Sequence, residues 1–560
     1  MTSRPKPDPR RRWQPKLILC LQSYTRQDLT RDVLAGLTVG LIALPLAMAF
    51  GIASGVTPQA GIYTAIIGGF LVAALGGSSI QVSGPTGAFV AIIAAIIAKH
   101  GMSGLLIVTF MAGVMLLLLA VTGLGTAVRF IPRPIVIGFT NGIALLIAST
   151  QVKDFLGLKF EGNPTEFFAR VEVIAAHLAT IDWGSVSLAF LSLFLILITP
   201  RWLPRIPGSV LALVAGTAAV AIFQLPVDTI GTRFGGIPQG LPVFSVPQFR
   251  ADLILPLLPA AFTVAMLAAI ESLLSAVVGD RMSGDRHNPT VELAAQGVAN
   301  IVVPFFGGIP VTGAIARTAA NYRVGGRTPV SAIVHALTVL LLVLLLGPLA
   351  KSIPLAVLAA VLFVVAYNMS EWREVPSIWR LDLPEKSVWL LTFVLTVVAD
   401  LTIAVEVGMA LAALLYIYRI AQTTTVSAVT SEYVESGHVH SLQGKHIPPY
   451  VSVLRIHGPF LFGTTDQLEE LTTDLNALAH IVIVRLRNTT AMDSNGLHAL
   501  ESLHDRLDRS GRKLILCGAR DQPANLLKRA DFLSHIGKDN IQPNVAAALV
   551  RAADLERTRI

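Results

Sequence analysis

Two short stretches decide the fold: Pro85-Thr86-Gly87-Ala88 in the first half of the chain and Val311-Thr312-Gly313-Ala314 in the second. Each follows a Gly-rich stretch and opens a short apolar segment, over residues 85–98 and 313–321. At about 1.5 Å per residue, these segments are too short to cross roughly 30 Å of bilayer hydrocarbon. The two stretches therefore predict half-helices that begin inside a membrane.

The composition around these stretches is that of a membrane protein. Of the 560 residues, 53% are hydrophobic and only 14% are charged, whereas a soluble protein carries about 25% charged residues. Of the 78 charged residues, 37 lie among the 398 residues from 33 to 430. This distribution predicts a basic N-terminal tail (1–32), a transmembrane transport domain (33–430), a linker (431–449) and a soluble C-terminal domain (450–560).

Charge and cysteine usage exclude several classes of protein. The net charge of +8 comes from the tail and the membrane part, because residues 431–560 hold fifteen basic and fifteen acidic residues. A neutral soluble domain argues against a nucleic-acid partner. Cys20 and Cys517 are the only cysteines, so a disulfide framework is not expected. Lys and Arg in alternate short loops, including Arg201, Arg281 and Arg323, place both termini in the cytoplasm and predict a multi-pass protein of the cell inner membrane.

The two halves of the membrane part show a repeat. Apolar stretches between residues 33 and 430 group into seven plus seven spans, several of them interrupted by Gly or Pro. Counting back 41 residues from Thr86 leads to Pro45, and from Thr312 to Glu271, each deep in the first span of its half. This pattern is typical of inverted-repeat transporters whose broken helices meet at the midplane. The predicted fold class is an α-helical polytopic membrane protein with a small α/β domain.

Half-helices that face each other suit an anion. A helix that begins within a membrane presents unpaired N–H groups and about half a positive charge. Gly residues let a ligand approach the backbone, and Thr86 and Thr312 add hydroxyl donors. The alternative is that Gly and Pro only allow close helix packing.

Two charged residues stand close to these segments. Glu271 lies inside an apolar span, where a carboxylate is costly and commonly marks an ion or proton pathway. Burial favours its neutral, protonated form, so proton uptake is expected; the alternative is a Glu bonded to polar groups of neighbouring helices. Arg317, four residues beyond Gly313, either adds positive charge to the anion site or marks the cytoplasmic end of its short helix.

Three motifs together resemble the sulfate permease family, the bacterial relatives of solute carrier family 26. They are Leu44-Pro45-Leu46-Ala47-Met48-Ala49-Phe50 in the first span, Gln81-Val82-Ser83-Gly84-Pro85-Thr86-Gly87-Ala88 in the third, and Gly307-Gly308-Ile309-Pro310-Val311-Thr312-Gly313-Ala314-Ile315-Ala316-Arg317 in the tenth. The resemblance implies a core domain of spans one to four and eight to eleven, a gate domain of the other spans, and a homodimer. It also implies an anion site whose lining residues are Phe50, Phe89, Glu271, Ser275, Gly313, Ala314, Ala316 and Arg317.

Two departures from the family pattern bear on substrate and coupling. Ile315 stands at the place where the sodium-coupled members of the family look as if they carry a Thr. The side chain of an isoleucine offers no oxygen ligand to sodium. Leu46 stands where many anion-exchanging members carry a Gln. The first-span and tenth-span motifs are most similar to those of the proton-coupled C4-dicarboxylic acid transporter branch. Glu271 and Ser275 are accordingly the predicted proton-coupling residues.

The C-terminal part has the alternation of a small α/β domain. Strands are predicted over residues 451–456, 481–486 and 513–517, with helices between them. Asp493 and Ser494 follow a strand and open a helix, so either residue can cap it. This placement resembles the STAS domain (sulfate transporter and anti-sigma factor antagonist), in which the matching serine of the antagonists is phosphorylated; an ordinary helix cap is the alternative.

The leading functional hypothesis is a secondary active anion transporter that takes up C4-dicarboxylates such as fumarate, succinate and aspartate with protons by an elevator mechanism. The alternatives are a sulfate or bicarbonate transporter or exchanger of the same family, an uncoupled anion channel, and a membrane-anchored regulatory protein. The expected partners are a small anion, a proton, lipid, a second copy and a cytoplasmic protein at the STAS domain. No P-loop, metal-ligand spacing or catalytic triad is present in the sequence, so neither a cofactor, a metal nor an enzyme activity is expected.

Overall fold

The computed structural model describes residues 13–123, 132–160, 164, 166–203, 207–236, 240, 242–248, 250–399, 401–429 and 447–559. The chain divides into two compact units, Met1–Ala412 and Ala413–Ile560. The start of the predicted basic tail and most of the predicted linker lie outside the described residues.

The described part of the chain up to Thr423 is mainly helical, and fourteen membrane segments follow one another along it. They are α2 (Arg26–Ala53), α3 (Pro58–Tyr63) continued by a π-turn and α4 (Gly69–Leu75), the two halves of α5 (Val90–Thr122), α6 (Arg133–Leu156), α8 (Trp183–Trp202), α9 (Gly208–Phe223), α11 (Ile254–Ser283), α12 (Pro289–Val302), α13 (Ile315–Val324), α14 (Pro329–Leu346), α15 (Leu355–Met369), α17 (Leu383–Val398) and α18 (Leu401–Thr423). Short helix α1 (Lys16–Leu21) precedes them, and α7 (Phe167–Ala176), α10 (Ile230–Phe234) and α16 (Val375–Ile378) lie between them.

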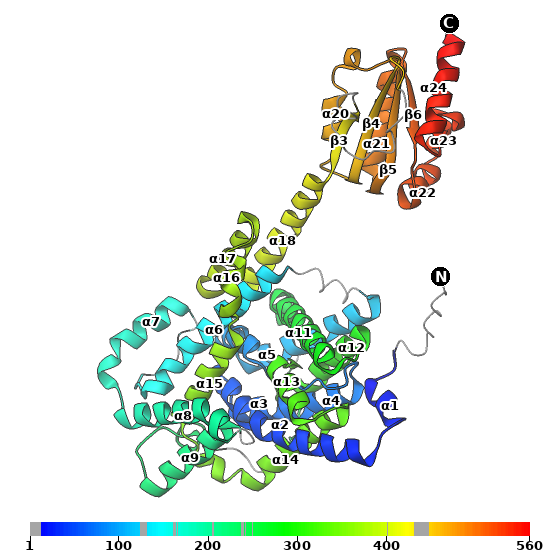
Figure 1. Ribbon diagram of the computed structural model, residues 1–560. Coiled ribbons are helices and arrows are strands. Elements are labelled where there is room, and N and C mark those ends of the chain that lie inside the picture. The colour runs from blue at the N-terminus through cyan, green and yellow to red at the C-terminus, as the bar shows by residue number, and fades with distance from the viewer. Residues whose placement is uncertain are drawn as a thin grey trace. The chain divides into compact units, whose positions relative to one another are not determined.

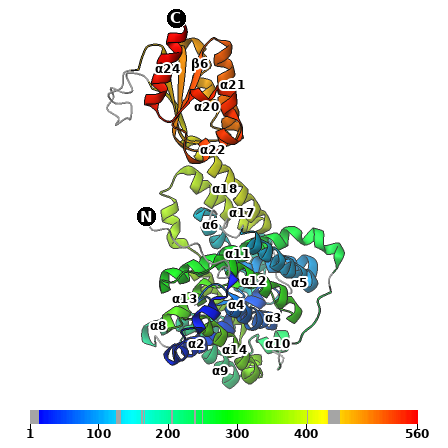
Figure 2. The ribbon, with the colours of Figure 1, turned by 90° about the vertical axis from the view of Figure 1, so that its right-hand side faces the viewer.

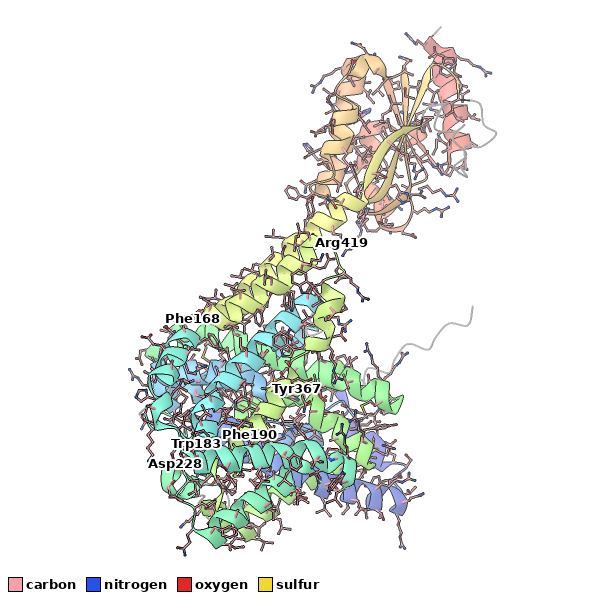
Figure 3. The ribbon with its side chains drawn as sticks, turned by 60° about the vertical axis from the view of Figure 1, so that its left-hand side comes forward. Phe168, Trp183, Phe190, Asp228, Tyr367 and Arg419 are labelled. Carbon is pink, nitrogen blue, oxygen red and sulfur yellow. The ribbon has the colours of Figure 1, made fainter. Side chains whose placement is uncertain are left out.

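Eight helical stretches among the described residues are long and apolar enough to cross a membrane alone. Helix α8 shows why. Its 20 residues span about 30 Å, and Trp183 and Trp202 at its two ends are 73% and 76% exposed. Trp183 and Phe190 lie on the outer surface of the helices (Figure 3). Tryptophan at both ends of an exposed apolar helix is typical of a lipid-facing span with interfacial anchors. The predicted fold class is confirmed.

A break at Gly101 divides α5 into the two predicted spans. Gly101 has φ of +66° and ψ of −169° within an otherwise helical stretch. That backbone conformation is accessible to glycine and costly for residues with a Cβ atom. The third and fourth membrane segments are therefore joined by a sharp turn rather than by a loop.

The seven-plus-seven repeat is visible in the helix packing. Helix α2 packs along α14, and its counterpart α11 packs along α5. Helix α4 likewise packs on α14, and its counterpart α12 packs on α5. Helices α6, α8, α9, α15 and α17 form a second set that packs mainly within itself. Figure 1 shows α6, α8 and α9 gathered on one side, with α4, α11, α12 and α13 on the other.

The two predicted half-helix starts meet at a two-stranded antiparallel crossing. Strand β1 (Ser83–Gly84) pairs with β2 (Thr312–Gly313), with Ser83 opposite Gly313 and Gly84 opposite Thr312. A single 3₁₀ turn (Gly87–Phe89) and α5 follow the first strand, and α13 follows the second. Water cannot hydrogen-bond extended backbone inside a membrane, so the two strands of the crossing supply these partners to each other.

The second unit contains a five-stranded sheet in the order β3-β4-β5-β6-β7. The strands are β3 (Thr425–Val429), β4 (Val451–Phe460), β5 (Ile481–Met492), β6 (Lys513–Cys517) and β7 (Ile541–Gln542). The helices are α20 (Asp466–Leu471), α21 (Ser494–Arg509), α22 (Asp521–Arg529), α23 (Phe532–Ile536) and α24 (Val545–Arg559). Only β3 runs antiparallel to its neighbour.

Both faces of this sheet are covered. Along β5, Val482 and Val484 pack in the cluster that includes α21, whereas Ile481 and Ile483 pack in the cluster that includes α24. Figure 2 shows α21 and α24 on opposite sides of the strands. A strand buried on both faces reads as a continuous apolar run, which is why the sequence pattern located these strands.

Close helix approach at Gly40 is testable. A methyl group added there would lie 2.6 Å from Thr338 Cβ on α14, so Gly40→Ala forces α2 and α14 apart. Overpacking of this kind costs about 1–3 kcal/mol. We expect a lower thermal midpoint for the full chain in detergent, measured by the loss of the monodisperse peak after heating.

The matched control is Leu41→Ala on the same helix, because Leu41 is 40% exposed on the outer surface. This control should melt close to wild type. Equal midpoints for Gly40→Ala and wild type would contradict the proposed close contact.

Candidate anion site

The start of α13 is held by backbone and hydroxyl partners. Ala314 N donates to Val82 O at 2.9 Å, and Gly313 N donates to Ser272 Oγ at 3.0 Å. The first intrahelical bond runs from Thr318 N to Ala314 O at 2.8 Å. The amides of residues 315–317 precede that bond, and they form the donor end of the helix dipole. Predicted site residues Gly313 and Ala314 are buried, and Ala316 is exposed.

Thr86 and Glu271 are brought into contact by the crossing. Thr86 Oγ1 donates to Glu271 Oε2 at 2.8 Å, although the two residues are 185 positions apart. Thr86 precedes the 3₁₀ turn that opens α5, and Glu271 lies in α11. The carboxyl group therefore lies directly at the beginning of the first half-helix. It is also partly exposed.

Arg317 lies in the first turn of α13, at the N-terminal end of this helix. Its side chain is buried, at 4% exposure. Its Nη2 donates to Pro85 O at 2.6 Å. A methyl group added at Gly84 would lie 2.6 Å from Arg317 Nη1, so the guanidinium fits because position 84 lacks a side chain. A buried guanidinium in the first turn favours a place within the site over a charge that only marks the far end of the helix.

The side chains of Ser275 and Thr312 point into contacts between neighbouring segments. Ser275 Oγ lies 3.0 Å from Thr318 Oγ1, which in turn accepts from Val82 N at 3.1 Å. Thr312 Oγ1 donates to Ala268 O at 3.0 Å. Both side chains are fully buried. Their hydroxyl groups thus bind α11 to the crossing, and the hydrogen-bond partner of the Ser275 hydroxyl is Thr318.

Phe50 and Phe89 form an apolar wall beside the first half-helix. They are 5% and 0% exposed and belong to one large core cluster. A methyl group at Gly87 would lie 3.0 Å from Ile147 Cδ1 of α6 and 3.3 Å from Phe50 Cε1. Gly87 therefore marks a close approach of the two sets of helices near Thr86.

A cavity of about 60 Å³ opens beside Glu271. It is bounded on one side by α11 and Ile315, and on the other by residues that the sequence analysis did not single out: Ile135, Val136, Phe139, Thr140, Glu371 and Thr392. Ile315, 40% exposed, presents hydrocarbon here. Sodium prefers oxygen ligands, so the wall at Ile315 offers it none.

A buried carboxylate, that of Glu292, binds the residues next to the crossing. Glu292, on α12 and 1% exposed, accepts from Gly77 N at 3.0 Å and from Gln81 Nε2 at 2.8 Å. Gln296 Nε2 donates to Glu292 Oε1 and to Ser83 Oγ, each at 3.1 Å. The sequence analysis missed Glu292, although a charge within an apolar segment was the signal that found Glu271.

In the C-terminal unit, Asp493 caps α21. Its Oδ1 accepts from Gly496 N at 2.9 Å and its Oδ2 from Phe462 N at 3.0 Å. Burial opposes ionisation, but these backbone N–H donors hold the pKa of Asp493 below its ordinary value. Ser494 is exposed in the first turn.

Burial raises the pKa of Cys517 to about 11, so this thiol is a packing residue.

The membrane part matches the model of the sulfate permease family over residues 29–392, and the C-terminal part matches that of the STAS domain over residues 445–548. The chain belongs to the sulfate permease family. This membership makes it a multi-pass anion transporter rather than an enzyme, and fourteen spans are consistent with it.

Relatives of this sulfate permease family member cover most of its length. A putative sulfate transporter, YvdB of Bacillus subtilis (strain 168), is 40% identical over 93% of this chain and 97% of its own. The bicarbonate transporter BicA of Picosynechococcus sp. is 29% identical over 94% of this chain and 95% of its own. The structure of murine Solute Carrier 26 family member A9 superposes with a TM-score of 0.86 at 18% identity, covering 99% of this chain and 96% of that chain.

The Thr86–Glu271 contact is testable by side-chain replacement. Thr86→Val keeps the shape and removes the hydroxyl that donates to Glu271, whereas Thr86→Ser keeps the hydroxyl. We expect at least a tenfold lower rate of anion uptake in proteoliposomes for the Val variant and near-normal uptake for the Ser variant. Equal losses in both variants would show that the methyl group, and not the hydrogen bond, matters.

Proposed function

We propose that this chain is a proton-coupled secondary transporter of C4-dicarboxylates. The observation that carries the proposal is the hydrogen bond between Glu271 and Thr86, at the start of a half-helix and within reach of a cavity. An anion bound at the half-helix starts would lie close to this carboxyl. Its protonation state would then govern anion affinity.

The size of the repulsion between an ionised Glu271 and a bound anion supports coupling of anion binding to proton binding. Two like unit charges 4 Å apart repel by about 4 kcal/mol at an effective dielectric constant of 20, which corresponds to about a thousandfold in affinity. Protonation of Glu271 removes this repulsion, and Arg317 and the helix dipoles then attract the anion without an opposing charge. The chain would therefore bind anion and proton together and release them together.

The substrate class is the finer part of the proposal. The cavity beside Glu271 is walled largely by apolar side chains, including Leu267, Ile270 and Ile315. Such a wall suits the carbon chain of a C4-dicarboxylate better than the uniformly polar surface of sulfate. Sulfate or bicarbonate is the second candidate, because relatives bear the names of sulfate and bicarbonate transporters.

The proposed movement is an elevator step of the core against the gate. The core comprises α2–α5 and α11–α14, and it carries Thr86, Glu271 and Arg317 as one unit. The gate set, α6, α8, α9, α15 and α17, contributes the far wall of the cavity. The proposal includes a homodimer in the cell inner membrane, cytoplasmic termini and the domain limits 1–32, 33–430, 431–449 and 450–560. It also includes regulation of transport through Asp493 and Ser494 by a cytoplasmic partner.

Proton coupling is tested by Glu271→Gln. The amide cannot exchange a proton, and it still accepts from Thr86. We expect the variant to lose accumulation driven by an inward proton gradient in proteoliposomes while retaining exchange of labelled substrate across equal concentrations. Wild-type uptake should rise as the external pH falls, and the variant should lack this dependence.

The matched control is Glu406→Gln, an exposed glutamate of α18, which should behave as wild type. Acid-stimulated uptake that survives in Glu271→Gln would overturn the coupling assignment. If the wild-type protein never accumulates the anion beyond its electrochemical equilibrium, it is a channel and not a coupled carrier.

Counterflow separates the substrate candidates. Proteoliposomes loaded with fumarate, succinate, sulfate or bicarbonate should accumulate labelled succinate only when a transported anion is inside. We expect counterflow with fumarate and succinate. If labelled succinate accumulates against none of the internal anions, while labelled sulfate or bicarbonate accumulates against its own unlabelled form, the dicarboxylate assignment is refuted and the anion transporter assignment stands.

A further inference from the structure

Three potential metal ligands converge on the surface of the STAS domain. His504 and Asp505 lie on α21, and His535 lies on α23. One ligand atom from each residue can be chosen so that all three lie within 4.8 Å of one another. The sequence gives no warning of this cluster, because the two histidines are 31 residues apart and match no metal-binding spacing.

The geometry within the cluster is already close to that of a metal site. His535 Nε2 lies 3.0 Å from Asp505 Oδ1, and the rings of His504 and His535 have centroids 5.1 Å apart at an interplanar angle of 72°. Ligand atoms about 2.1 Å from a tetrahedral ion lie about 3.4 Å apart. Small side-chain rotations therefore suffice to place all three around one ion.

The cluster rests on a rigid base. Phe532 of α23 is 1% exposed and lies against the His535 ring, with centroids 6.0 Å apart. Leu503 and Leu507 of α21, which flank His504 and Asp505 in sequence, are fully buried. A ligand set held by two packed helices loses little conformational freedom on binding.

The polar surroundings also suit a cation. His504 Nδ1 is buried and has no hydrogen-bond partner among the described residues. A buried nitrogen without a partner is uncommon and commonly indicates a missing interaction. The nearby cation Lys513 is paired with Asp508 at 2.6 Å, so its charge is largely neutralised.

We propose that His504, Asp505 and His535 form a binding site for a divalent transition-metal ion of the Zn²⁺ class. Two imidazoles and one carboxylate are the ligand types that zinc, nickel and copper accept, whereas calcium and magnesium require more oxygen ligands. Water completes the coordination. Binding would tie α23 to α21 and stabilise this edge of the STAS domain, because an ion that binds only the folded state raises its stability.

The test uses the full chain, purified in detergent with a tag that contains no histidine and stripped of metal by a chelator. Calorimetric titration with Zn²⁺ should show one saturable site per chain, and titration with Co²⁺ should give visible d–d absorption. His504→Gln, His535→Gln and Asp505→Asn should each weaken binding at least tenfold. His498→Gln is the matched control, because His498 lies on the same helix and its side chain is 79% exposed.

A gain-of-signal variant keeps the test independent of folding. His504→Cys replaces one ligand by another, so it should retain one Co²⁺ and add a thiolate-to-cobalt charge-transfer band. Zn²⁺ should raise the thermal midpoint of wild type and of His498→Gln but not of His535→Gln. Absence of a saturable site in wild type, or equal loss in His498→Gln and His504→Gln, would overturn the proposal.

Discussion

The pairing of Ser83 and Gly84 with Gly313 and Thr312 is the constraint on which the rest of the membrane unit depends. Extended backbone at membrane depth must find partners inside the protein, and these few residues satisfy each other across the two repeats. Because the strands run antiparallel, the helices that follow them point away from each other. The crossing thereby fixes where α13 and the 3₁₀ turn before α5 begin, and with them the positions of Thr86 and Arg317.

Several polar side chains near the crossing form hydrogen bonds that fix its backbone in place. Ser272 accepts from Gly313 N, Thr318 accepts from Val82 N, and Glu292 binds Gln81 from behind. Each bond satisfies a buried polar group that would cost about 1–3 kcal/mol if left unpaired. The backbone next to these groups is consequently rigid, and a rigid donor array binds an anion with little reorganisation.

Sequence reasoning located the elements better than it oriented their side chains. Gly/Pro interruptions and a charge in an apolar span reveal where a helix breaks and which residue is costly, so Thr86, Glu271 and the STAS strands were found. The inward turn of Ser275 and Thr312 depends on the rotation of α11 against α13, which a nearly all-apolar helix does not encode. The cavity wall from Phe139 and Glu371 depends on how two helix sets pack, and the His504 cluster on a contact between helices distant in sequence.

The chain segment Pro85-Thr86 is bound by two different helices, α13 and α11. Arg317 donates to the Pro85 carbonyl, and Glu271 accepts from the Thr86 hydroxyl. One contact comes from α13 and the other from α11, so both elements of the second repeat determine where the half-helix of the first repeat begins. Protonation of Glu271 weakens its hold on the Thr86 donor, because a charged acceptor bonds more strongly than a neutral one. Under the proposed coupling, a proton at this carboxyl would change both the charge that an anion meets and the position of the half-helix amides, and the two effects would act on the same site.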